Sequence, residues 1–83
     1  MLVVKILGPG CSNCKRLAWL VERAIGRLGI EAEIIKVTDY SEIMKYPILA
    51  TPGLVINEKL VASGRIPGEA EITTFLTSAL ETA

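Results

Sequence analysis

The spacing of apolar residues changes several times along this chain, and each change predicts a new element of secondary structure. The first apolar run, Leu2–Leu7, is rich in β-branched residues and stops at Gly8, which predicts a largely buried strand. From Ser12 the spacing becomes three and four residues, which places the apolar positions on one face of a helix that Gly29 ends. These positions are Cys14, Leu17, Val21, Ala24, Ile25 and Leu28.

The middle of the chain predicts a second strand and a short helix. The segment Glu31–Val37 has apolar residues at Ala32, Ile34, Ile35 and Val37, a pattern typical of a strand. Asp39 followed by Glu42 three residues later is similar to a capping box and marks a helix start. Pro47 limits this helix, because the residue before a proline avoids helical geometry.

The last third of the chain predicts a hairpin and a closing helix. Two short strands, Leu54–Ile56 and Leu60–Ala62, flank a turn at Asn57–Lys59. Gly68 then opens a helix whose first turn carries two acidic residues, which suit the positive end of a helix. The positions expected to be buried on this helix are Ile72, Phe75, Leu76, Ala79 and Leu80.

The predicted element order is β-α-β-α-β-β-α, which is an α/β architecture. A helix joins the first two strands, so they should be parallel with a right-handed crossover, whereas the last two should form an antiparallel hairpin. The result is a four-stranded mixed sheet flanked by helices. The 83 residues suit one domain that spans residues 1–83.

Composition removes several classes of function. Nine basic residues balance nine acidic ones, so the chain lacks the net positive charge of a protein that binds nucleic acid or an anionic membrane. The longest apolar run, Leu17–Val21, is too short to span a membrane, and the N-terminus has no signal-peptide pattern, which favours a cytoplasmic location. The absence of histidine excludes Ser-His-Asp and Cys-His catalysis as well as His-ligated metal.

The candidate chemistry lies in the two cysteines, Cys11 and Cys14, between the first strand and the first helix. Cys11 falls at the start of the helix, where unpaired N–H groups should lower the pKa of its thiol, with Lys15 and Arg16 adding positive potential. Cys14 shares the apolar face of the helix, so it should be the more buried thiol. We therefore expect Cys11 to be the attacking nucleophile and Cys14 the resolving thiol of a redox pair.

Two other uses of the same thiols remain open. A pair of thiolates would suit a linear copper(I) site, as in small chaperones of the βαββαβ type, whereas structural zinc would require four ligands. Those chaperones end in a strand, but this chain is predicted to end in a helix. A third possibility is a non-catalytic subunit whose thiols only sense redox state.

A second motif, Ala50–Gly53, resembles part of a known family. On local sequence alone, Pro52-Gly53 predicts a type II turn. However, the segment Tyr46–Leu54 resembles the thioredoxin segment ahead of its cis-proline, and it stands between the short helix and the hairpin. Together with the two cysteines and Gly64, it makes nearly the whole chain similar to the small, glutaredoxin-sized thioredoxin-like proteins of archaea and some bacteria.

The resemblance implies a thioredoxin fold and an oxidoreductase that reduces protein disulfides through Cys11 and Cys14. It implies a cis-proline at Pro52 facing the sulfurs and a substrate peptide bound to the backbone of Thr51. Residues adjoining the cysteines, namely Gly10, Ser12 and Asn13, complete the implied substrate site. No bound cofactor and no metal are implied, and a thioredoxin-reductase-like flavoprotein or another dithiol would recharge the pair.

The sequence departs from the thioredoxin pattern at three places. Gly10 stands where thioredoxins have tryptophan, and Ser12-Asn13 replace Gly-Pro between the cysteines. Lys5 stands where thioredoxins bury an aspartate that assists proton transfer. Lys5 either reaches solvent through its long stem or acts as a cation that lowers a thiol pKa.

Overall fold

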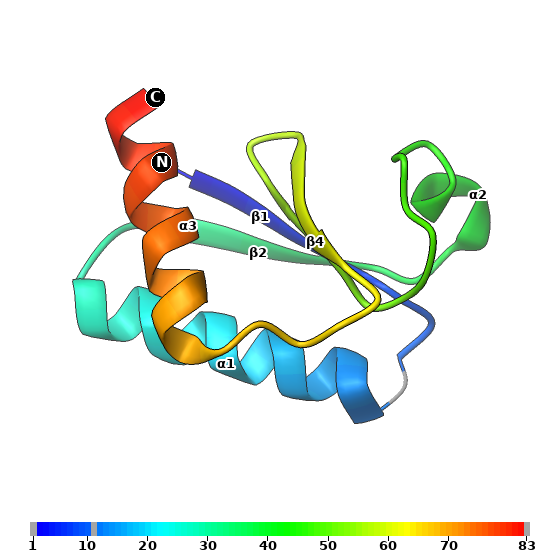
Figure 1. Cartoon of the computed structure of the whole chain (residues 1–83), viewed down its shortest axis with the longest axis horizontal. Helices are drawn as coiled ribbons and strands as arrows, with labels where there is room; N and C mark the ends of the chain where they lie inside the picture. Colours follow the sequence, from blue (N-terminus) through cyan, green and yellow to red (C-terminus); the bar gives the residue numbers. More distant parts are fainter. Residues whose placement is uncertain (1, 11, 83) are drawn as a thin grey trace.

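Four strands form one mixed sheet in the order β2-β1-β3-β4 (Figure 1). The computed structural model of the chain describes residues 2–10 and 12–82, with side chains as far as residue 81. The strands are β1 (Leu2–Leu7), β2 (Ala32–Val37), β3 (Gly53–Ile56) and β4 (Lys59–Ser63). β1 is parallel to β2 and antiparallel to β3, and β3 and β4 form the hairpin. The predicted α/β order and the mixed sheet are therefore confirmed.

Helices cover the two faces of this sheet unequally (Figure 1). The long helices α1 (Ser12–Leu28) and α3 (Glu69–Thr82) pack on one face. The short helix α2 (Tyr40–Ile43) packs on the other face, where Ile43 joins Leu7 and Val55 in a small apolar cluster. The main core contains Leu2, Val4, Ile6, Leu17, Ala18, Val21, Ala24, Leu54, Ile56, Ala62, Ile72 and Leu76.

The start of α2 and the hairpin turn follow local sequence chemistry. Asp39 caps α2 as predicted, because its carboxylate accepts a hydrogen bond from the Ser41 N–H at 3.0 Å. The turn between β3 and β4 uses two residues, Asn57 and Glu58, whose φ values are 50° and 67°. Left-handed conformation at both central residues matches the twist of a two-residue hairpin, so Lys59 belongs to β4 rather than to the turn.

The apolar stripe predicted for α3 is correct except at its end. Ile72 and Leu76 are fully buried, and Phe75 and Ala79 pack against the core at its margin. Leu80 was expected to be buried, but its exposed fraction is 43%. The last turn of α3 extends past the strands, so the core ends before Leu80 (Figure 1).

Candidate functional site

The turn from β1 to α1 brings the candidate redox motif to one end of the sheet. The Gly8 N–H donates to the Val37 carbonyl at 2.9 Å, which ties the turn to β2. Gly10 has φ of 94°, in the region that favours glycine, and the chain then enters α1. Ser12 and Asn13 are exposed in the first turn of α1. Cys11, the predicted nucleophile, lies outside the described residues.

Cys14 lies on the core-facing side of α1 and is only 5% exposed. It shares this side with Leu17 and Val21, because residues three, four and seven positions apart line one face of a helix. The expectation that Cys14 is buried is therefore confirmed. Its burial suits a thiol that acts within the molecule rather than on an approaching partner.

The side chains of Cys14 and Thr51 both lie near the open side of Gly8. A Cβ atom placed on Gly8 would overlap the Cys14 Sγ and would lie 3.8 Å from the Thr51 Cβ. The absence of a side chain at Gly8 therefore leaves the space in which the Cys14 sulfur sits. This approach joins two motifs that are far apart in the sequence.

The loop before β3 presents Thr51 and Pro52 at this point. The peptide bond between them is cis, Thr51 is half-buried and Pro52 is buried. The Gly64 N–H donates to the Pro52 carbonyl at 2.9 Å and so fixes the loop to the end of β4. The type II turn expected from local sequence is wrong, because Gly53 is the first residue of β3 and lacks the positive φ that such a turn needs.

A small cavity of about 90 Å³ opens beside Cys14. Its lining includes Gly8, Gly10 and Cys14, and it also includes Lys15 of α1 and Lys36 of β2. Sequence reasoning missed Lys36 as a site residue. The parallel pairing of β1 with β2 could have indicated it, because Lys36 is the register partner of Ile6, just before Gly8.

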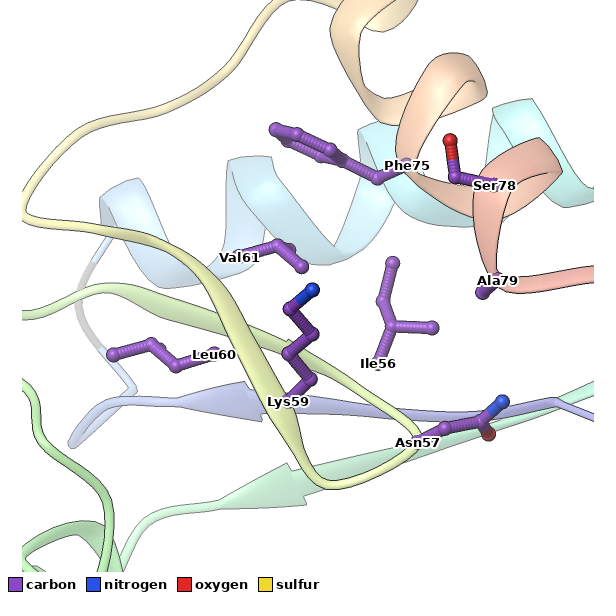
Figure 2. Close-up of a pocket in the computed structure, with 8 residues that line it drawn as sticks. All are labelled: Ile56, Asn57, Lys59, Leu60, Val61, Phe75, Ser78 and Ala79. Carbon is purple, nitrogen blue, oxygen red and sulfur yellow. The ribbon is translucent and has the colours of Figure 1, made fainter. Parts of the chain in front are cut away.

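A larger hollow of about 490 Å³ lies elsewhere, between the β3–β4 hairpin and α3. Figure 2 shows Phe75 of α3 above Val61 and Ile56 of the hairpin across this hollow, with Asn57 at the turn and Lys59 at the start of β4. None of the described residues predicted for the redox site lines it. Of the two hollows, the smaller one is therefore the one that Cys14 lines.

Lys5 lies in a hydrogen-bonded cluster on the face of the sheet that α2 covers. Its ammonium group donates to the Tyr46 hydroxyl at 2.9 Å and to the Glu58 carboxylate, and the Tyr46 hydroxyl donates to Glu58 at 3.1 Å. These bonds, that to Glu58 above all, raise the pKa of Lys5 above its ordinary value of 10.5. Neither of the two roles expected for Lys5 included these partners. The bonds join β1 to the hairpin turn and to the loop after α2.

The same bonds predict how stability depends on pH. The bond from Lys5, followed by that from Tyr46, lowers the pKa of Glu58 below its ordinary value of 4.5. A carboxylate with a lowered pKa stabilises the fold above its unfolded pKa, and this contribution disappears as pH falls through the folded value. Glu58→Gln should therefore destabilise the protein at about pH 7 and much less at about pH 3.

Urea unfolding of the two proteins at both pH values measures this effect. Glu33→Gln is the matched control, since Glu33 is exposed and the described part of the chain shows no ion pair for it. The effect should be modest, because the side chain of Glu58 is 67% exposed. An equal loss of stability at both pH values would show that the ion pair is not its cause.

Most of the chain is similar in sequence to known proteins of one family. The family model described as a thioredoxin domain matches residues 2–77. A thioredoxin of Methanocaldococcus jannaschii is 42% identical over 81 residues, which cover 98% of this chain and 93% of that protein. A thioredoxin of Methanothermobacter thermautotrophicus is 34% identical over 76 residues, covering 92% of this chain and 99% of that one.

Comparison with solved structures identifies the fold from the coordinates rather than from sequence identity. Thioredoxin-2, described as a component of the malaria parasite's protein secretion machinery, superposes with a TM-score of 0.70 at 13% identity, covering 94% of this chain and 82% of that one. Within residues 2–10 and 12–82, no helix combines the length and apolar character needed to cross a membrane. The predicted thioredoxin fold is therefore confirmed, and the chain belongs to the thioredoxin family.

Proposed function

We propose that this chain is a dithiol electron carrier that reduces disulfides in other proteins. The observation that carries the proposal is that the buried Cys14 sulfur and the Thr51 side chain both lie within 4 Å of the position that a Gly8 Cβ would take. A disulfide held against the Thr51 backbone would lie next to the thiols, so binding and chemistry would occur at one place. Membership of the thioredoxin family supports the same activity.

The proposed reaction has two steps. The Cys11 thiolate attacks one sulfur of the target disulfide, and the other sulfur leaves as a thiolate that takes up a proton. The Cys14 thiol then loses its proton and attacks the mixed disulfide, which forms the Cys11–Cys14 disulfide and releases the second target thiolate. Two electrons have then passed from the chain to the target.

The remaining assignments complete the proposal. Thr51 and Pro52 hold the target, and Gly10, Ser12 and Asn13 flank it at the start of α1. A thioredoxin-reductase-like flavoprotein or another dithiol returns two electrons to the Cys11–Cys14 disulfide. Residues 1–83 act as one domain in the cytoplasm, with no bound cofactor or metal.

The two other candidate uses of the thiols are less well supported. Copper chaperones of the type considered from the sequence have a βαββαβ fold, whereas the element order of this chain is β1-α1-β2-α2-β3-β4-α3. A redox sensor would be oxidised once by a disulfide and would not turn over. Multiple turnover therefore separates a carrier from a sensor.

The experiment is reduction of insulin with dithiothreitol as the electron donor. The chain should accelerate the reaction over many cycles at substoichiometric concentration, and Cys11→Ser should return the rate to that of dithiothreitol alone, because no attacking thiolate remains. Copper(I) added in a parallel sample tests the alternative. Stoichiometric oxidation without turnover would reject the carrier, and suppression of oxidation by tightly bound copper(I) would favour a chaperone.

A further inference from the structure

We propose that the thiol end of the molecule is a cationic docking surface, formed by Lys15 and Lys36, for disulfides flanked by acidic residues. The inference rests on the proposed function, since it names the class of target that the redox site prefers. Both lysines are exposed, and both line the cavity beside Cys14. They come from different elements, α1 and β2, so the tertiary structure brings them together.

Most cations of the chain are neutralised by a carboxylate. Ion pairs hold Lys5 with Glu58, Lys45 with Glu42, Arg65 with Glu71, and both Arg23 and Arg27 with Glu69. In the described part of the chain, no carboxylate comes within 4.0 Å of Lys15, Lys36 or their neighbour Arg16. Three uncompensated cations thus belong to the elements at the thiol end.

The carboxylates outside these ion pairs lie mainly elsewhere. Glu31 stands just before β2 and Glu33 is near the start of that strand, and Glu81 stands in the last turn of α3. Figure 1 places both chain ends at the end of the sheet opposite the start of α1. Glu22 lies further along α1, on its exposed side. The zero net charge therefore does not cancel the positive charge around the thiols.

One carboxylate lies close in sequence to Lys36. Asp39 follows the cavity residue Thr38, but one of its oxygens accepts hydrogen bonds from the Ser41 N–H and hydroxyl at 3.0 and 2.9 Å. Its carboxylate thus faces the start of α2. Because screening in physiological salt acts over about 8 Å, the charges at the far end contribute little potential at the thiols.

Electrostatic complementarity defines the partner. An acidic segment that carries a disulfide would place its carboxylates near Lys15 and Lys36 while its sulfurs approach the thiols. Such an arrangement raises the rate of productive encounter more than it raises affinity, and salt weakens it. The partner is thus a polypeptide whose disulfide is bordered by aspartate or glutamate.

The test uses three peptides that share one intramolecular disulfide and differ only in flanking Glu, Gln or Lys residues. The pre-reduced chain is mixed with each peptide, and its single oxidation is followed, so no reductase is required. The Glu peptide should react about tenfold faster than the Lys peptide in low salt, and the ratio should shrink in about 0.5 M salt. Reaction of the same peptides with dithiothreitol corrects for their intrinsic reactivity.

Two variants assign this preference to the surface. Lys15→Glu combined with Lys36→Glu should abolish or reverse the ratio, and the double Lys→Arg variant should retain it. Lys59→Glu is the matched control, because Lys59 is an exposed cation at the start of β4 and does not line the cavity beside Cys14. Each variant is judged by the ratio of its rates with the Glu and Lys peptides. A change in thiol reactivity alters both rates equally and leaves this ratio unchanged.

The outcomes separate the two proposals. Equal rates for the three peptides, or a ratio unchanged in the double Glu variant, would overturn the cationic surface. Turnover of the Gln peptide with dithiothreitol would still support the carrier function in that case. If the single oxidation is faster with the Glu peptide but no peptide is turned over with dithiothreitol, the cationic surface would be supported and the carrier function would be rejected.

Discussion

Cys14→Ser should convert the chain from a turning-over reductase into a trap for its targets. Without the Cys14 thiol, the mixed disulfide between Cys11 and the target has no neighbouring sulfur to resolve it. A thiol held in the same molecule acts at an effective concentration that millimolar dithiothreitol cannot match, so turnover should fall on the order of 100-fold or more. Cys14 is 5% exposed, which favours attack within the molecule.

Insulin reduction and mass spectrometry of the products measure this prediction. Cys14→Ser should accumulate a covalent complex with a target chain that dithiothreitol releases. Cys11→Ser is the matched control, since it removes the attacking thiol and should form no such complex. Equal trapping by both variants would refute the assigned order of attack, because Cys14 would then also react directly with targets.

Gly8→Ala should both destabilise the fold and impair the thiol pair. The new Cβ would overlap the Cys14 Sγ, which has only one side-chain torsion with which to move away. Overpacking of a buried site typically costs about 1–3 kcal/mol. The displaced sulfur would also leave its position beside Gly8, so resolution of the mixed disulfide should slow.

Gly26→Ala is the matched control, because it makes the same substitution but should raise the stability of the fold instead of lowering it. Gly26 is exposed within α1, and apart from its chain neighbours and the adjacent backbone of α1, a Cβ there would meet no atom within 4 Å. Replacing a glycine inside a helix with alanine stabilises it by roughly 0.5–1 kcal/mol. Urea unfolding and insulin reduction should therefore separate the two variants. Unchanged stability and activity in Gly8→Ala would contradict the close approach of Cys14 to Gly8.

Local patterns in the sequence were sufficient for the element order and for the side of α1 that faces the core. Strand and helix periodicities differ, so Leu2–Leu7 and the stripe through Cys14 and Leu17 could be assigned from spacing alone. The Asp39 cap was similarly local. The burial predicted for Leu80 was wrong, because the apolar spacing of α3 continues after the surface against which the helix packs has ended.

Tertiary structure decided the surroundings of the thiols. Pro52-Gly53 reads locally as a turn, but the pairing of Gly53 with Leu7 extends the chain there instead. The ion pair of Lys5 with Glu58 and the position of Lys36 beside Cys14 likewise join residues of different elements. Spacing along the chain reports which side of an element is apolar. Only the pairing of strands and the packing of helices fix which polar residues meet across elements.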